Sequence, residues 1–320
     1  MSGAAELLPA DATYGSLVGE VADPLMQRRM GRWYWAAFAL AGVMTLVMVG
    51  SIAWLFIEGI GIFGNNTTIV WGFPIANYVW WVGIGNAGTL ISSMLLLTRQ
   101  PWRAAINRFA EAMTLFAVSI AGLFPILHLG RPYLAYWLAP YPNTMLLWPQ
   151  WKSALVWDFA AIITYLLFSV MFFYLGLIPD LATLRDRAQS RRGQVIYGIL
   201  ALGWRGSARH WARHDAVYRA MAAMAVPLVV SVHSVVGLDF AAGLMPGWQE
   251  TIFPPYFVVG ALYSGFAMVV LLAALMRWGF GLQSLLTFRH FELMAKVILA
   301  ASVVMGLSYA TEWFMSWYAG

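Results

Sequence analysis

The fold is decided by long uncharged stretches, the first of which reads WYWAAFALAGVMTLVMVGSIAWLFI at residues 33–57. A helix needs roughly 20 mostly apolar residues to cross the hydrocarbon core of a bilayer. Six further stretches of this kind follow, at residues 78–98, 109–128, 154–177, 218–237, 255–276 and 292–315. The sequence therefore predicts an all-α polytopic membrane protein with about seven transmembrane helices.

The composition excludes a soluble enzyme and limits the cofactors. Apolar residues make up 61% of the chain, charged residues only 10%, and the mean hydropathy is +0.71. The chain contains no cysteine, so it cannot form a disulfide or ligate an iron–sulfur cluster through thiolates. We expect no metal or haem in this chain, and any iron–sulfur cluster must belong to a partner. The net charge of +5 reflects loop Lys and Arg residues rather than nucleic-acid binding.

The basic residues predict the orientation in the membrane. If the seven stretches alternate in direction, 17 of the 19 Lys and Arg residues fall on one side, and only Arg131 and Lys152 fall on the other. Cytoplasmic loops carry the excess of Lys and Arg in membrane proteins. The sequence therefore predicts a cytoplasmic N-terminal tail at residues 1–32 and a transmembrane domain at residues 33–320.

Polar residues from the second to fifth stretches gather at one depth near the outer face. They are Asn86, His128, Arg131, Asp158, His233 and Asp239. A carboxylate inside the hydrocarbon edge, such as Asp158, is costly unless it is paired or takes part in proton movement. Oxidation of a quinol needs hydrogen-bond partners for two hydroxyl groups and a base that accepts protons, which His and Asp side chains supply. The cluster therefore predicts a quinone site.

Each of these residues also has a structural interpretation. Asp158 could form an ion pair with Lys152 or Arg131, His128 could cap its helix, and Asp239 could be an ordinary loop acid. A thinner polar set lies near the inner face, where Glu111 and Lys296 are candidates for a proton path. Glu111 in a first helical turn is equally explained by the helix dipole, and Lys296 by snorkelling toward the headgroups.

Four motifs resemble the polysulfide reductase NrfD family. They are WVGIGNAGT at residues 81–89, NRFAEAMT at 107–114, HLGRP at 128–132 and HSVVGLDF at 233–240. Within that family the chain looks most like the quinol-oxidising membrane subunit of bacterial alternative complex III. The resemblance implies that the second to fifth helices form a four-helix bundle containing the quinone site. The family's site positions match His128, Asp158 and Asp239, and Asn86, Arg131 and His233 would help to bind the quinone.

The resemblance also implies the assembly around the chain. Menaquinol or ubiquinol would be oxidised near the periplasmic face of a bacterial inner membrane. Electrons would pass to a periplasmic iron–sulfur subunit and then to c-type cytochrome subunits, alongside other membrane subunits, and the family has been proposed to couple this reaction to proton translocation. The outward loops at residues 133–151 and 246–256, rich in Pro and aromatic residues, would hold the iron–sulfur subunit.

Two departures and several alternatives accompany this hypothesis. Related sequences often have His where this chain has Asn86, and they continue with further helices beyond the position of Gly320, which suggests a truncated chain. One alternative is a quinone-reducing membrane anchor of a molybdopterin oxidoreductase of the polysulfide reductase type, and another is a non-redox proton transporter. A haem b protein using His128 and His233, or a retinal protein using Lys296, would also fit part of the pattern.

Overall fold

The computed structural model describes residues 7–26, 31–64, 72–128, 132–139, 154–243 and 250–320. Every regular element in these ranges is a helix, which confirms the predicted all-α class. The elements are α1 (Tyr14–Met26), α2 (Arg32–Glu58), the 3-10 helix η1 (Ile60–Phe63), α3 (Phe73–Leu97), α4 (Arg103–Ala121), α5 (Phe124–His128), the 3-10 helix η2 (Pro132–Leu138), α6 (Ala154–Arg187), α7 (Arg191–Leu200), α8 (Ala208–Ala241), α9 (Phe253–Phe280) and α10 (Phe288–Ala319).

Seven spans among the described residues are long and apolar enough to cross a membrane, in agreement with the prediction. The helices extend past several predicted ends. α6 continues to Arg187, and α8 begins at Ala208 rather than near residue 218. Its N-cap is Ser207, whose hydroxyl oxygen accepts a bond from the His210 backbone amide at 3.2 Å. A hydropathy pattern detects only the apolar part of a helix. In α6 and α8 the backbone hydrogen bonds of the helix continue beyond that part into charged residues.

The third span is not the single helix that the sequence predicts. α4 ends at Ala121, a turn follows at Gly122 and Leu123, and α5 begins at Phe124. Pro125 explains the break, because its ring would clash with the carbonyl group of Ala121 and it has no backbone N–H to donate. Pro125 instead occupies the first turn of the new helix, where that missing donor costs little.

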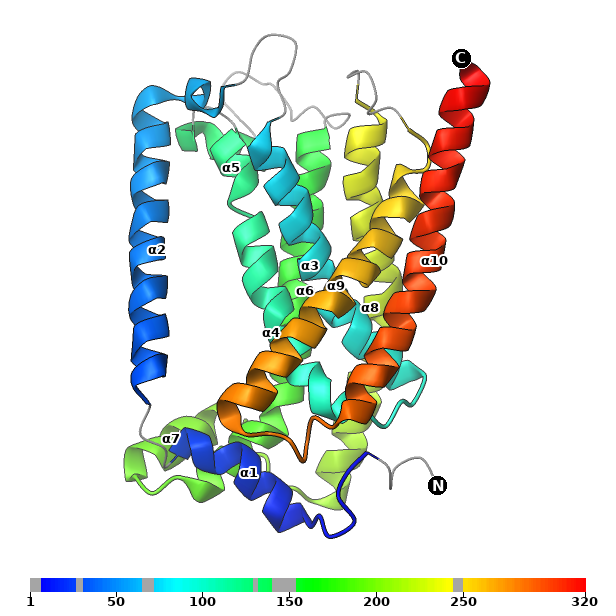
Figure 1. Ribbon diagram of the computed structural model, residues 1–320. Coiled ribbons are helices and arrows are strands. Elements are labelled where there is room, and N and C mark those ends of the chain that lie inside the picture. The colour runs from blue at the N-terminus through cyan, green and yellow to red at the C-terminus, as the bar shows by residue number, and fades with distance from the viewer. Residues whose placement is uncertain (1–6, 27–30, 65–71, 129–131, 140–153, 244–249) are drawn as a thin grey trace.

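The four helices of the second to fifth spans form a closed ring, and that this ring holds a quinone site stays a prediction. α3 contacts α4 and α8, and α6 contacts the same two helices (Figure 1). α9 packs against α3 and α8 outside this ring, and α10 packs against α9. Glycine permits the closest approaches: a Cβ atom on Gly88 would overlap the Ala110 carbonyl group, and one on Gly265 would overlap the Ala87 side chain.

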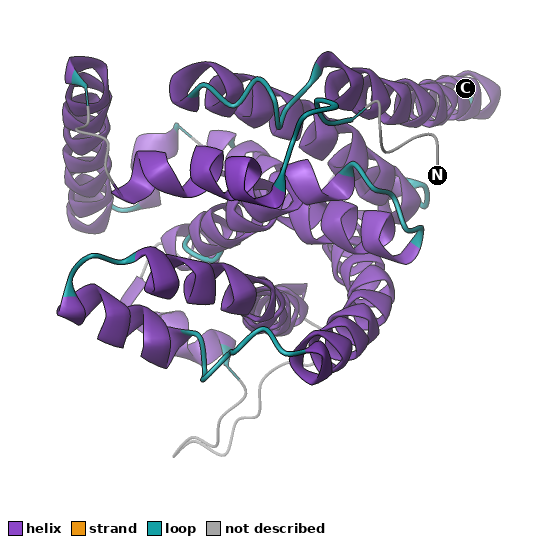
Figure 2. Cartoon of the chain, turned by 90° about the horizontal axis from the view of Figure 1, so that it is seen from below, coloured by secondary structure: helices purple, strands orange, loops and turns teal. Residues whose placement is uncertain are grey.

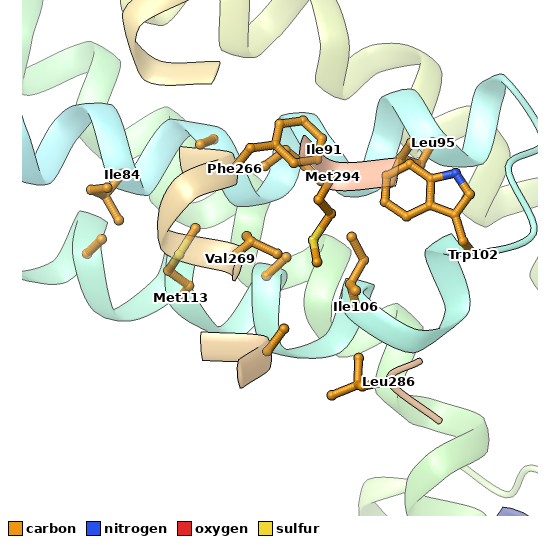
Figure 3. Packing of buried hydrophobic residues seen from close by; sticks show 14 of the residues in the cluster. Ile84, Ile91, Leu95, Trp102, Ile106, Met113, Phe266, Val269, Leu286 and Met294 are labelled. Atoms are coloured by element: carbon orange, nitrogen blue, oxygen red, sulfur yellow. The ribbon is translucent and has the colours of Figure 1, made fainter. Parts of the chain in front are cut away.

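The larger apolar core lies where α9 and α10 cover α3 and α4. Ile91, Ile106, Val269 and Met294 are each at most 1% exposed and interdigitate there (Figure 3). A second core inside the ring contains Tyr165, Val229 and Val236. These two cores hold α3 from both sides, so α3 is the most buried of the seven spans.

α2 stands apart from the bundle. It lies at the left edge of both views, separate from the other helices (Figures 1 and 2). Only 6% of its most apolar window is buried, against 72% for α3. In a bilayer, α2 is therefore surrounded by lipid or by other membrane helices on nearly every face.

The predicted N-terminal tail contains a helix that docks on the bundle. α1 lies across one end of the molecule, near α7 (Figure 1). Asp23 on α1 forms an ion pair with Arg187 at 2.9 Å, and the Ser284 hydroxyl group donates a hydrogen bond to Glu20. We call this end the basic end; it comprises α1, α7 and the loops at residues 98–102 and 281–287.

Candidate functional site

Two carboxyl groups and a phenol meet near the end of the ring opposite the basic end. Asp158 lies on α6 and is 8% exposed, Tyr78 lies on α3 and is 3% exposed, and Asp239 on α8 is half-buried. The three side chains are close enough to interact electrostatically. Among the described residues, Oδ1 of Asp158 and both carboxylate oxygens of Asp239 have no hydrogen-bond partner. Buried polar atoms of this kind point to a role beyond packing.

A second polar pair joins α3 to α8 about two turns further along α3. The side-chain nitrogen of Asn86 is 2.7 Å from Nδ1 of His233, and the two residues are 1% and 2% exposed. Because an amide nitrogen donates, Nδ1 of the imidazole accepts, and the ring proton resides on Nε2. Oδ1 of Asn86 has no partner in the described part of the chain. His233 also packs against Phe257 of α9, with ring centroids 6.0 Å apart.

The structure thus divides the predicted outer cluster into two sets. Asp158 and Asp239 face one another from α6 and α8, whereas Asn86 and His233 meet between α3 and α8 beside α9. His128 is the last residue of α5, and the position of its side chain is not described. Arg131 and Lys152 lie outside the described residues. The catalytic role of His128, the binding role of Arg131 and the ion-pair alternative for Asp158 therefore stay predictions.

A pocket of about 160 Å³ opens beside His233. Its walls come from α3, α8, α9 and α10, and they include the aromatic rings of Trp80 and Phe257. The wall is mostly apolar, with His233, Tyr256 and Ser264 as its polar members. Such a combination suits a flat ring that carries a hydrogen-bonding oxygen.

Hydroxyl groups connect the outer end of the ring to its interior. Tyr165 on α6 is 1% exposed and donates to the backbone carbonyl group of Gly85 at 3.0 Å. Further inward, the Thr89 hydroxyl donates to Ser169 at 3.3 Å, and the Thr114 hydroxyl accepts from the Thr89 backbone amide at 3.0 Å. α3 therefore presents a polar face along much of its buried length.

This polar face leads to a charged network near the basic end. Glu111 is 1% exposed and accepts hydrogen bonds from Ser92 and, at 2.7 Å, from the phenol of Tyr218. Arg108 and Arg103 approach its carboxylate at 3.4 and 3.7 Å. Arg108 also pairs with Asp180 at 2.6 Å, and a cavity of about 470 Å³ lies against these side chains.

The network corrects the explanation of Glu111 by a helix dipole. α4 begins at Arg103, so Glu111 lies more than two turns inside the helix, beyond the reach of its N-terminal dipole. Arg103 and Arg108 were counted as loop charges in the sequence, but both belong to α4 and turn into the bundle. Two partly buried guanidinium groups, 13% and 33% exposed, lie beside this buried carboxylate and explain its retention in an apolar interior.

Residues 61–318 match the family described as "Polysulphide reductase, NrfD". The chain belongs to the NrfD family. It is 26% identical over 238 residues to a putative membrane subunit of dimethyl sulfoxide reductase from Halobacterium salinarum, covering 73% of this chain and 50% of that protein. It is 24% identical over 244 residues to a selenate reductase subunit from Mesobacillus selenatarsenatis, covering 73% of this chain and 55% of that protein. The chain spans about half the length of these curated relatives.

Membership in the NrfD family establishes the general class of this protein. The chain is a multi-pass membrane protein, and the two curated relatives are named as subunits of a dimethyl sulfoxide reductase and of a selenate reductase. No group of three or more His, Cys, Asp or Glu residues that could hold a metal occurs in the described ranges. The buried polar atoms of α3, α6 and α8 make this bundle the candidate functional site.

Lys296 of this NrfD chain does not join the charged network around Glu111. Its side chain is 60% exposed and pairs with Glu292 at 2.7 Å. An exposed, ion-paired amine is not the buried lysine that a retinal protein needs to form a protected Schiff base. Among the described residues its ion pair is with Glu292 and not with Glu111, and its role in a proton path stays a prediction.

The sequence interpretation missed several residues that the structure places at these sites. Tyr78, Tyr165 and Tyr218 were not among the predicted site residues, and neither were Arg103 and Arg108, which precede the predicted third stretch at residues 109–128. One signal was present. Asn86, Thr89 and Ser92 are spaced three residues apart, and Ser93 lies four residues after Thr89, which predicts a single polar face on a helix that is otherwise apolar.

Proposed function

We propose that this chain is the quinol-oxidising membrane subunit of a molybdopterin reductase, and that it delivers electrons to an iron–sulfur subunit. The names of the two relatives support this proposal, because they describe subunits of a dimethyl sulfoxide reductase and of a selenate reductase. They fit the molybdopterin alternative better than a quinol:cytochrome c complex. A reductase consumes electrons, so its membrane subunit oxidises quinol, which is the reverse of the quinone-reducing direction expected for such an anchor from the sequence.

The acid pair of Asp158 and Asp239 is the observation that carries the proposal. Oxidation of one quinol releases two electrons and two protons, and the protons need acceptors at the place of reaction. Two carboxyl groups side by side can accept a proton and pass it on. The orphaned oxygens of Asp158 and Asp239, with Tyr78 beside them, offer hydrogen-bonding positions to a quinol hydroxyl group.

The location of the acid pair fits the proposed electron acceptor. The pair lies near the end opposite the basic end, and the positive-inside rule assigns that end to the periplasmic face of an inner membrane. An iron–sulfur subunit docked there would lie over the quinol site. The loops proposed to hold it, at residues 133–151 and 246–256, lie mostly outside the described residues.

A proton connection through the ring is a further part of this proposal. The hydroxyl groups of Thr89, Thr114 and Ser169 lie between the acid pair and the Glu111 network, and the large cavity beside Arg108 opens at the basic end. Glu111 is therefore the candidate for a proton-exchanging group on the inner side.

The test is quinol oxidation by the purified complex carrying Asp158→Asn or Asp239→Asn. We expect a loss of turnover of about 100-fold or more, the scale of a general-base contribution. The iron–sulfur subunit must still co-purify in each variant. Asp186→Asn is the matched control, because Asp186 lies on α6 like Asp158 but is 67% exposed and pairs with Arg185.

Two results would decide against parts of the proposal. Normal turnover in both variants with an intact complex would show that the acid pair is structural. Co-purification with c-type cytochromes instead of a molybdopterin subunit would favour the alternative complex III assignment, while leaving the acid pair as the quinol site.

A further inference from the structure

We infer that the pocket beside His233 is a second quinone position, separate from the acid pair, at which the quinone ring is held as it exchanges with the lipid. The inference rests on the proposed function, since it names the same substrate. It adds a site between the four-helix ring and the α9–α10 pair, with His233 as its hydrogen-bonding residue and Asn86 as the residue that positions His233.

The size and walls of the pocket fit a single flat ring system. At about 160 Å³ it is smaller than the several hundred cubic ångströms of pockets that enclose whole drug-sized ligands. A quinone ring would fit while its isoprenoid tail stayed in the bilayer. Trp80, which is 45% exposed, and Phe257 provide aromatic surfaces against which such a ring can stack.

Two glycines keep this space open. A Cβ atom on Gly260 would meet only the Met305 side chain, at 3.7 Å and beyond, and one on Gly83 would meet Ala261 and Ser264 at 3.9 Å. These are ordinary van der Waals separations, so packing alone would tolerate a side chain at either position. Gly265 on the same helix differs, since its missing Cβ is filled by Ala87. The absence of side chains at Gly83 and Gly260 therefore leaves volume that no neighbouring residue uses.

The pocket offers a hydrogen-bond donor to the carbonyl oxygen of a quinone. The Asn86 amide occupies Nδ1 of His233, so the N–H on Nε2 is the donor that remains. That N–H already donates to the backbone carbonyl group of Phe257 at the pocket wall, and a ligand oxygen would share it in a bifurcated hydrogen bond. The Ser264 hydroxyl donates to the Gly260 carbonyl group at 2.8 Å and keeps its oxygen lone pairs for a quinol hydroxyl. The pocket can thus bind either redox form.

The residues that line the pocket include neither Asp158 nor Asp239. Asn86 lies between the pocket and the interior of the ring, because its side chain bonds to His233 and its backbone carbonyl group accepts from Tyr165 at 3.3 Å. A ring in the pocket would therefore not touch Asp158 or Asp239. The quinone ring would bind in the pocket before or after the reaction, and it would be oxidised or reduced only at the acid pair.

Photoaffinity labelling of the purified complex tests this inference. The probes are short-tailed azido derivatives of a benzoquinone and a naphthoquinone, and labelled peptides are mapped after illumination. We expect labels on α9, within Phe253–Phe280, in addition to labels near the acid pair. Gly260→Leu should reduce the α9 label at least tenfold and raise the apparent KM for quinol several-fold. Gly260→Ala should give smaller changes in the same direction, with the complex intact by size-exclusion chromatography.

The matched control is Gly306→Leu, because Gly306 follows Met305 on α10 and has no atom within 4 Å of its Cβ position. An α9 label that persists in Gly260→Leu, or labels found only near Asp158 and Asp239, would overturn the inference. Displacement of the probe by phospholipid but not by quinone would also overturn it and identify the pocket as an acyl-chain site. If α9 is labelled while Asp158→Asn retains normal turnover, the proposed role of the acid pair fails and the second position stands.

Discussion

Asn86 and His233 are 147 positions apart in sequence, yet the Asn86 amide nitrogen lies 2.7 Å from Nδ1 of His233 in the interior of the bundle. This bond joins α3 to α8 where both helices also contact α9. It fixes the orientation and the tautomer of the imidazole ring at the wall of a pocket. An asparagine can hold the histidine in this way but cannot take a proton from it, which gives position 86 a positioning role rather than a proton-transferring one.

Replacing Asn86 with Leu should therefore destabilise the bundle and loosen His233. The buried imidazole would lose its partner, at a cost of about 1–3 kcal/mol. Asn77→Leu is the control, because Asn77 lies on the same helix and donates only to the carbonyl group of Phe73 near the surface. Thermal unfolding of the two variants in detergent makes the comparison. Equal shifts in Tm would mean that the Asn86–His233 bond contributes nothing specific.

The glycine at position 88 should not tolerate a methyl group. A Cβ atom there would overlap the Ala110 backbone, which cannot move aside without separating α4 from α3. We expect Gly88→Ala to cost about 1–3 kcal/mol, the range for overpacking a close-packed interior. Gly42→Ala on the isolated helix α2 meets no atom within 4 Å and should leave stability unchanged or slightly raised. A Gly88→Ala protein as stable as the parent would show that the two helices are not in such close contact.

The number and order of the transmembrane helices could be predicted because hydropathy over some 20 residues reflects the thickness of the bilayer. The break before Pro125 could also have been predicted, since proline disfavours helix continuation, but an uninterrupted apolar run concealed it. The positions of the Arg103 and Arg108 side chains could not be predicted from the sequence. The excess of basic residues on one side shows where a helix ends, but not whether its terminal arginines face water or turn back to a buried Glu111.

The candidate site was predicted in part for a similar reason. Asp158 and Asp239 were recognisable because an acid in an apolar run is rare and costly. The prediction grouped Asp158 and Asp239 with Asn86 and His233 because all four lie at a similar depth in the membrane. The two sets are separate in the structure because their side chains point in different directions around the helix axes. His233 and Asp239 are six residues apart on α8, which puts them on different faces of that helix. The tyrosines carried no signal, because a phenol is equally common in the interfacial belt.

Lys296 should be dispensable for activity. Its ammonium group is largely exposed and paired with Glu292, and exposed ion pairs contribute about 0–1 kcal/mol. We expect Lys296→Met to keep quinol oxidation within about twofold of the parent and to leave stability nearly unchanged. Steady-state turnover of the purified complex measures this. A large loss of turnover would place Lys296 on the proton path.

Glu111 should be far more important for stability than its neighbour Asp180, although both pair with Arg108. The Glu111 carboxylate is 1% exposed and faces Arg103, Arg108 and Tyr218, whereas the Asp180 side chain is 48% exposed. Removing one partner of a buried ion pair leaves the other charge unpaired, at a cost of about 3–5 kcal/mol. Glu111→Leu should therefore lower Tm by many degrees or prevent assembly, and Asp180→Leu should cost about 1 kcal/mol or less.

Glu111→Gln separates the role of the charge from that of the hydrogen bonds. The amide oxygen of glutamine can still accept from Ser92 and from the phenol of Tyr218, so the packing and two hydrogen bonds survive. Only the negative charge opposite Arg103 and Arg108 is lost, and an intermediate Tm should result. If Gln were as stable as Glu, the two guanidinium groups would already be neutralised by Asp180 and by backbone carbonyl groups, such as that of Ser92 3.0 Å from Nε of Arg103. If the glutamine variant were as unstable as the leucine variant, the carboxylate charge itself would be what stabilises the two guanidinium groups of α4 inside the bundle.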